Sequence, residues 1–481
     1  MPFKKLTEQP ENPFSGIVPG QTIVEIPEFE LESGEIIFNV PVAYKTWGKL
    51  NDAGDNCMII THALTGSADV FDWWGPLLGR DKAFDPTKFF IICLNSLGSP
   101  YGSASPLTHD HEFGERYGPE FPICTVRDDV TIHKMVLDDL GVKSCAICIG
   151  GSMGGMLALE WTFVDGGKFV KNLVALATSA KHSAWCISWG EAQRQCIYSD
   201  PKYEDGYYSL DDPPLAGLGA ARMSALLTYR SRNSFETRFG RGAPTEKQQS
   251  KGSPHTANKE DASAIVDDDR EINWSVHNDG SQRTRSFESH KSTRSNSVIS
   301  EAPSDDTTST TVSPVARQRT RSRRLPQHYF SAQSYLRYQA QKFTKRFDAN
   351  CYISITRKLD THDLGRDRPE YSNQASKALQ SRTQPALIIG ISSDALFTLS
   401  EQIFIAKHLP NSTLKKIDSP EGHDAFLLEF DGINKMILDF ERENLKDIME
   451  HKGNNEEWDE ESVEQGKKES VFGEAEDVAQ W

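Results

Sequence analysis

The feature that most constrains the fold is an apolar segment that leads directly into a glycine-rich turn around a serine. Residues 147–149 precede GGSMG at 150–154, which has the pattern G-x-S-x-G, and the helix-like stretch Met156–Phe163 follows. The glycines let a strand and a helix approach closely, and Ser152 lies at the start of the helix, where negative charge is favoured. A phosphate-binding turn is the alternative, but this turn has no lysine. The segment therefore predicts a serine nucleophile.

Short apolar runs flank this segment on both sides. Runs that are apolar on both faces are typical of central strands in a parallel sheet covered by helices. A helix is predicted over Thr125–Leu140, and the stretch Thr22–Trp47 predicts an antiparallel edge. Together they predict an α/β protein with a mostly parallel sheet. The predicted central strands are Cys57–Thr61, Phe89–Leu94, Ala146–Ile149, Leu173–Ala177, Ala386–Ile391 and Leu414–Ile417.

A serine nucleophile needs a base and a carboxylate that orients the base. In the α/β-hydrolase fold these follow in the order Ser, Asp, His, each after a strand. Asp394 follows the run that ends at Ile391, and His423 follows the predicted strand Leu414–Ile417. We therefore expect Ser152, Asp394 and His423 to form a catalytic triad. The rival carboxylates, which no strand-like run precedes, are Asp360, Asp363 and Asp367.

Two backbone N–H groups are the candidates for the oxyanion hole. One belongs to Met153, the residue after the predicted nucleophile. The other belongs to Leu64, in the segment HALTG at 62–66 that directly follows the strand-like run CMIIT. The alternative for HALTG is a turn that only ends a strand.

Composition limits the classes of partner. A net charge of −16 argues against a general nucleic-acid binder, because phosphate backbones favour Lys and Arg. No run of 18 apolar residues exists and the N-terminal segment lacks an apolar signal core, so we expect no membrane span and a cytoplasmic location. Cys145 and Cys148 lie in an apolar run and are interpreted as small buried hydrophobic residues. We expect no metal and no cofactor.

Two segments are too polar to form a core. Residues 243–326 are rich in Ser, Thr, Arg, Asp and Pro and predict a disordered insertion; its end, at 317–324, is basic. Hydroxyl groups beside arginines, at 283–286 and 294–297, raise the alternative of a phosphorylated regulatory segment. Residues 446–481 predict an acidic disordered tail.

Several segments in this order resemble the homoserine O-acetyltransferase family, particularly its fungal members, over residues 10–242 and 328–442. They are HALTG at 62–66, GGSMGG at 150–155, ARM at 221–223, RFDAN at 346–350 and GHDAFL at 422–427. The resemblance implies the α/β-hydrolase fold with an inserted helical cap. The expected divisions are a core in two parts, 10–182 and 380–445, and a cap at 183–379 that contains the insertion.

The resemblance also implies an activity, the transfer of acetyl from acetyl-CoA to the hydroxyl of L-homoserine in methionine biosynthesis. Arg222 matches the family's arginine that binds the homoserine carboxylate, and Asp424 matches the aspartate that binds its amino group. A zwitterionic acceptor needs one fixed cation and one fixed anion. From the residues alone, Arg222 is interpreted as a helix-surface arginine. Beside the family roles, Tyr229 and Arg230 are weaker pocket candidates, and Arg232 and Arg238 are candidate surface residues. The family further suggests a homodimer formed through cap helices.

Three other functions are compatible with these sequence features. A related acyltransferase would use succinyl-CoA, or would acetylate serine or deacetylcephalosporin C. A plain serine esterase of the same fold would not need Arg222. A non-catalytic interaction protein would use the insertion at 243–326 as a docking arm.

Overall fold

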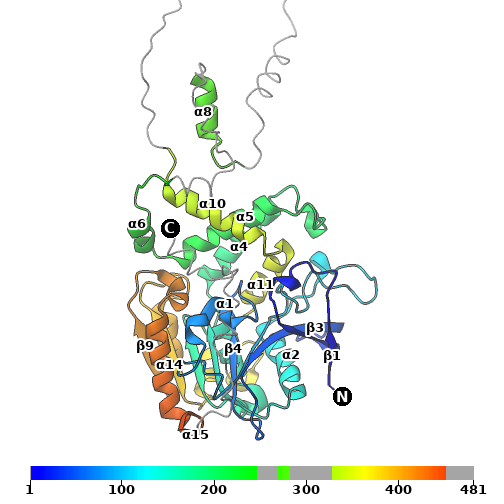
Figure 1. Cartoon of the computed structure of the whole chain (residues 1–481), viewed down its shortest axis with the longest axis vertical. Coiled ribbons are helices and arrows are strands. Elements are labelled where there is room, and N and C mark those ends of the chain that lie inside the picture. The colour runs from blue at the N-terminus through cyan, green and yellow to red at the C-terminus, as the bar shows by residue number, and fades with distance from the viewer. Residues whose placement is uncertain (1, 246–268, 282–327, 451–481) are drawn as a thin grey trace, which may run out of the picture. The chain divides into compact units, whose positions relative to one another are not determined.

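The computed structural model describes residues 2–245, 269–281 and 328–450, and its strands form one sheet. The strand order is β1-β2-β3-β5-β4-β6-β7-β8-β9, with β1 and β9 at opposite edges (Figure 1). The strands are β1 (Lys4–Leu6), β2 (Thr22–Glu30), β3 (Ile36–Trp47), β4 (Cys57–Thr61), β5 (Phe90–Leu94), β6 (Cys145–Gly151), β7 (Leu173–Leu176), β8 (Ala386–Ile391) and β9 (Ser412–Ile417).

The sheet has an antiparallel part and a parallel part. Strands β1, β2 and β3 pair antiparallel, and β3 also pairs antiparallel with β5. From β5 to β9 every neighbouring pair is parallel. The predicted mostly parallel sheet with an antiparallel edge is confirmed.

The central strands are buried on both faces. Every residue of β4, β5, β6, β7 and β8 is buried, and these include Cys145 and Cys148, as predicted. The flanking helices are α2 (Val126–Asp139), α3 (Met153–Trp161), α13 (Leu399–His408) and α14 (Phe430–Asn444). Helix α3 packs on β6 and β7, and α13 packs on β8 and β9. Helices therefore supply the apolar cover that the strand sequences require.

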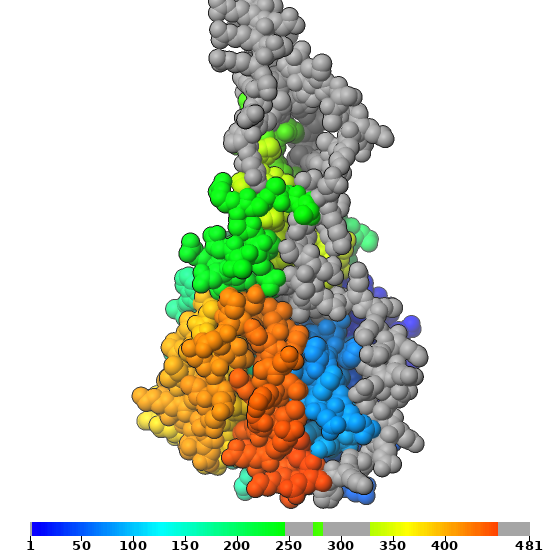
Figure 2. Space-filling model, turned by 60° about the vertical axis from the view of Figure 1, so that its left-hand side comes forward, coloured from blue at the N-terminus to red at the C-terminus, as the bar shows by residue number. Residues whose placement is uncertain are grey.

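Segments far apart in the sequence meet at one side of the sheet. Figure 2 shows the orange-red segment that contains α14 against the blue segment that contains α1 (Val70–Trp74). A hydrogen bond joins the two, because the Ala83 N–H donates to Asn434 Oδ1 at 2.8 Å.

The described residues between β7 and β8 form mainly helices and loops, in the part of the chain where the resemblance implied a cap. The helices that belong with the sheet in one compact unit include α4 (Ala184–Tyr198), α5 (Leu215–Tyr229), α6 (Arg232–Arg238), α11 (Ala349–Asp360) and α12 (Ala375–Gln380). Helix α4 packs against both α5 and α11. Figure 1 places these three helices above the ends of the strands.

The described residues between 239 and 338 belong to a second compact unit. It contains α8 (Asp269–His277) and most of α10 (Ser331–Thr344), and Arg337 pairs with Asp279 at 2.9 Å. The prediction that all of 243–326 lacks structure is therefore wrong at α8, where Trp274 is half-buried and an ion pair holds the following turn. The rest of the insertion from 246, including the basic cluster and the candidate phosphorylation sites, lies outside the described residues.

The prediction of a disordered tail from residue 446 is wrong for its first five residues. They form α15 (Lys446–Glu450), whose Ile448 and Met449 pack against the core. Lys88 Nζ also donates to the Met449 carbonyl oxygen at 2.7 Å. Residues 451–481 lie outside the described part. None of the described helices has the length and apolar character needed to cross a membrane.

Candidate active site

Ser152 lies in a strained turn between β6 and α3. Its φ of 59° and ψ of −126° are rare for a residue with a side chain. The turn packs directly on the end of β4: a Cβ at Gly154 would lie 2.1 Å from the Thr61 carbonyl oxygen, and one at Gly150 would lie 2.2 Å from Thr61 Oγ1. Both glycines are therefore required by close packing, which holds the serine at the carboxyl end of the sheet.

Ser152, His423 and Asp394 form a continuous chain of hydrogen bonds. The Ser152 hydroxyl donates to His423 Nε2 at 2.9 Å, and His423 Nδ1–H donates to Asp394 Oδ2 at 2.7 Å. The other Asp394 oxygen accepts the N–H groups of Leu396 and Phe397 at 2.8 and 2.9 Å. The three residues predicted from their order in the sequence thus converge in space.

The environment of His423 suits a general base. Burial works to lower the pKa of its imidazole, but the charge and hydrogen bond of Asp394 outweigh burial and hold the pKa above its usual value. Glu401 on α13 was not singled out by the sequence. Burial and the nearby Asp394 charge raise the pKa of its carboxyl to about 7. His423 therefore faces one firmly held carboxylate and one that titrates near neutrality.

His62 has the opposite electrostatic character. It accepts the Ser96 N–H at Nε2 (2.9 Å), so its Nδ1–H donates to the Ala63 carbonyl oxygen at 2.8 Å. Burial lowers its pKa to about 4. His62 therefore stays neutral and holds the backbone of the HALTG loop.

That loop lies beside the nucleophile turn. Thr61 Oγ1 donates to the carbonyl oxygens of Ile149 and Gly154, at 3.1 and 2.7 Å, so the end of β4 is fixed to the serine turn. Leu64 is three residues further on. The N–H of Met153 belongs to the first turn of α3, where helical geometry supplies no intrahelical partner. Both predicted oxyanion donors remain candidates by position.

Arg222, on α5, is buried, with 1% of its surface exposed. The interpretation as a helix-surface arginine is wrong. Its guanidinium lies over the rings of Tyr229 and Phe343, with 5.6 and 4.9 Å to the ring centroids. The Tyr229 ring lies 6.0 Å from the ring of His423. One aromatic ring therefore connects the predicted substrate arginine to the imidazole.

Asp424 follows His423 in the short 3-10 helix Gly422–Leu427 and is also buried. Its Oδ2 lies 2.9 Å from Arg230 Nε. The anion predicted to bind the homoserine amino group therefore already has one cationic neighbour.

Glu421, which the sequence did not single out, joins the histidine loop to the end of α5 and to α6. Its carboxylate accepts from Arg230 Nη1 at 2.5 Å, Ser234 Oγ at 2.7 Å and Arg238 Nη2 at 3.0 Å. We call these four residues the Glu421 cluster. Gly422, with φ of 73°, allows the close approach, since a Cβ there would lie 2.5 Å from the Ser231 nitrogen. The cluster fixes the loop immediately before His423.

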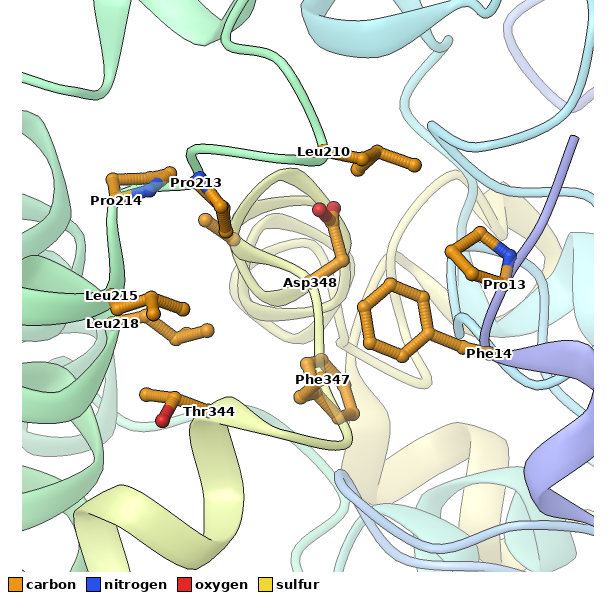
Figure 3. Close-up of a pocket in the computed structure, with 11 residues that line it drawn as sticks. Pro13, Phe14, Leu210, Pro213, Pro214, Leu215, Leu218, Thr344, Phe347 and Asp348 are labelled. Carbon is orange, nitrogen blue, oxygen red and sulfur yellow. The ribbon is translucent and has the colours of Figure 1, made fainter.

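A separate crevice contains none of the predicted site residues. Figure 3 shows that its lining is mainly apolar, with the Asp348 carboxylate as the charged group. Asp348 is already used, because it accepts the Tyr208 hydroxyl at 2.7 Å and caps α11. The crevice is lined by Pro13, Phe14, Leu210, Pro213, Pro214, Leu215, Leu218, Thr344, Phe347, Asp348 and Ala349.

Solved structures share this fold at low sequence identity. The crystal structure of esterase E22 superposes with a TM-score of 0.65 at 22% identity, covering 87% of this chain and 99% of that one. The homoserine O-acetyltransferase from Bacillus anthracis superposes with a TM-score of 0.63 at 18% identity, covering 87% and 96%. At these identities the likeness shows the fold alone.

Sequence comparison is more specific. The family model for the alpha/beta hydrolase fold matches residues 56–430. The homoserine O-acetyltransferase of Saccharomyces pastorianus is 57% identical over 476 residues, which cover 98% of this chain and 96% of that protein. The homoserine O-acetyltransferase of Emericella nidulans is 54% identical over 501 residues, covering 100% and 98%. The chain therefore belongs to the homoserine O-acetyltransferase family, within the α/β-hydrolase superfamily.

Proposed function

We propose that the protein transfers an acetyl group from acetyl-CoA to the side-chain hydroxyl of L-homoserine, through an acetyl-enzyme on Ser152. The hydrogen-bonded chain Ser152–His423–Asp394, with Arg222 buried nearby, is the observation that carries the proposal. The names of relatives at 54–57% identity over nearly the whole chain support it.

In the first half-reaction, Ser152 Oγ attacks the thioester carbonyl while His423 Nε2 takes its proton. The oxyanion accepts hydrogen bonds from the N–H groups of Leu64 and Met153. The tetrahedral intermediate collapses, the carbon–sulfur bond breaks, and the proton on His423 passes to the sulfur of CoA. Asp394 holds the imidazole in the required tautomer and stabilises its charged form.

In the second half-reaction, the homoserine hydroxyl takes the place of CoA. His423 removes its proton as the oxygen attacks the acetyl-enzyme, and the same proton then returns to Ser152 Oγ as the ester is released. Arg222 binds the acceptor carboxylate and Asp424 binds its ammonium group. Two charges held in fixed positions orient the hydroxyl, which favours homoserine over water.

A two-substrate assay of the purified protein tests the proposal. CoA release is followed with acetyl-CoA or succinyl-CoA as donor, and with homoserine, serine, deacetylcephalosporin C or no acceptor. We expect sustained CoA release only with acetyl-CoA and homoserine. Preference for another donor or acceptor would reassign the substrate. Rapid p-nitrophenyl ester hydrolysis that does not depend on Arg222 would indicate an esterase.

The cellular context is also a proposal. We propose a cytoplasmic homodimer without a bound cofactor or metal. Sedimentation at micromolar concentration tests the oligomeric state, and a fluorescent fusion tests the compartment. Deletion of residues 243–326, followed by an activity assay, tests the interaction-protein alternative. That alternative predicts no acetyl transfer by the full chain or by the deletion variant.

A further inference from the structure

We infer that Arg346 is a positioning residue for the oxyanion hole, and that it ties the HALTG loop to the arginine of the acceptor site. Arg346 opens the RFDAN segment between α10 and α11 and has no role in the proposed mechanism. The inference rests on the proposed function, since it concerns the loop that supplies the Leu64 N–H.

The Arg346 side chain is buried, with 5% of its surface exposed. Its Nη1 donates to the Thr65 carbonyl oxygen at 3.1 Å and to the Tyr101 hydroxyl at 2.9 Å. The Tyr101 hydroxyl in turn donates to the Arg346 carbonyl oxygen at 2.8 Å. Side chain and backbone of Arg346 are therefore both held by fully buried Tyr101, which fixes where Nη1 meets the loop.

The loop needs such a contact because its N–H must point in one direction. A peptide unit is planar, so the Leu64 N–H lies in the same plane as the Ala63 carbonyl. That carbonyl accepts from His62 Nδ1–H at 2.8 Å and from the Gly66 N–H at 2.9 Å. These bonds hold one end of the turn. Arg346 holds the other end, at the Thr65 carbonyl.

Arg346 also connects this loop to the acceptor site. The guanidinium groups of Arg346 and Arg222 both lie over the ring of Phe343, at 5.1 and 4.9 Å from its centroid. Burial lowers the pKa of Arg222, and the positive charge of Arg346 adds to the effect. Two buried cations on one ring favour a nearby anion, which is the chemistry expected for the acceptor carboxylate.

The expected effect follows from this geometry. Without Arg346 the turn keeps its hydrogen bonds at the Ala63 carbonyl but loses the one at the Thr65 carbonyl. The Leu64 N–H is then less well oriented towards the oxyanion. Removal of one oxyanion donor typically costs about 100- to 1000-fold in rate. A poorly oriented donor lowers the rate less than a missing one. We therefore expect Arg346→Met to slow acetyl-enzyme formation by about 10- to 100-fold.

Arg382 provides a matched control. It is buried, its guanidinium lies 4.5 Å from the centroid of the Phe163 ring, and it donates to the Thr162 carbonyl oxygen and the Tyr371 hydroxyl. These contacts repeat those of Arg346 away from the triad. Arg382→Met should therefore lower stability as Arg346→Met does, without changing the rate of acetylation.

The experiment measures the pre-steady-state burst of CoA release without acceptor, the KM for homoserine, and thermal unfolding, for both Met variants, Arg346→Lys and Tyr101→Phe. We expect a slower burst in Arg346→Met, partial recovery in Arg346→Lys because one nitrogen makes both hydrogen bonds, and a smaller loss in Tyr101→Phe. If Arg346→Met does not fold, the Lys and Phe variants carry the comparison.

A burst in the Arg346 variants as fast as in Arg382→Met would overturn the inference while leaving the proposed function intact. A change confined to the KM for homoserine would also overturn it. A wild-type protein that releases no CoA from acetyl-CoA would contradict the proposed function, and the inference with it.

Discussion

The loops at the carboxyl end of the sheet and the helices inserted between β7 and β8 hold their site residues in different ways. Asp394 and His62, in sheet loops, accept hydrogen bonds from backbone N–H groups. Arg222, in the middle of α5, lies over two aromatic rings, and Arg230, which caps the end of α5, pairs with the Asp424 carboxylate. A reacting group must be held closely in its productive geometry by packing and supporting hydrogen bonds, and the backbone N–H groups do this for Asp394. The chemistry should therefore depend on the sheet loops, and binding of the acceptor carboxylate on the inserted helices.

The largest expected effect in this comparison comes from Asp394. Asp394→Asn should lower kcat by about 10⁴-fold, because the imidazole loses its orienting carboxylate and its preferred tautomer. The base must be neutral to act, so wild-type activity is lost as pH falls through the raised pKa of His423. The midpoint of the acid limb in the pH profile of kcat/KM should lie above pH 6.5. A midpoint below pH 6.5 in the wild type would contradict the geometry given for Asp394.

A substitution in the inserted helices should separate binding from chemistry. Arg222→Met removes the cation proposed to bind the acceptor carboxylate, at a cost of about 2–4 kcal/mol, or about 30- to 1000-fold in kcat/KM for homoserine. The burst of CoA release from acetyl-CoA alone should stay close to wild type. Stopped-flow thiol detection measures both quantities. An equal loss in both would place Arg222 in the chemistry rather than in acceptor binding.

The Glu421 cluster lies where the two regions meet and should give a smaller effect. Glu421→Gln weakens the contacts with Arg230 and Arg238, and we expect about a 10-fold loss in kcat/KM for homoserine. Glu32→Gln is the control, since Glu32 also binds two arginines and one hydroxyl, and none of these three partners is a proposed site residue. Steady-state kinetics of both variants make the comparison. If both variants had the same kcat/KM for homoserine, the Glu421 cluster would have no role in acceptor binding.

The smallest effect on activity is expected outside both regions, at Glu441 on α14. Among the described residues neither of its carboxyl oxygens has a hydrogen-bond partner, and burial raises its pKa well above the usual value. Its neutral form is favoured by folding, so its contribution to stability is full below the unfolded pKa and is lost as pH rises.

Glu441→Gln should remove that dependence. The variant should unfold at a higher temperature than wild type, by a margin that grows from pH 5 to pH 8, and each unit adds at most about 1.4 kcal/mol. Its kcat should not change. Calorimetry at several pH values checks the trend, and a margin independent of pH would show that the Glu441 carboxyl is not kept neutral.

Local sequence patterns predicted the parts of the molecule that local physics determines. Three residues could be placed at the carboxyl end of a parallel sheet from local signals alone. These signals are the strand before Ser152, the glycines around it, and the apolar runs before Asp394 and His423. The prediction failed where contacts join distant positions. Arg230 meets Glu421 across 191 residues and Arg346 meets Thr65 across 281 residues, and neither pairing has a local signal. Helices α8 and α15 were missed because their segments are polar in composition. The few contacts that order them, such as Arg337 with Asp279 and Met449 with the core, have no local sequence signal.

The most direct test of the central claim is mass spectrometry of the intact protein and its peptides after incubation with acetyl-CoA alone. The account predicts one added acetyl group, on the peptide that contains Ser152, absent in Ser152→Ala and discharged within one turnover by homoserine. An acetyl group elsewhere, or one that homoserine does not remove, would contradict it.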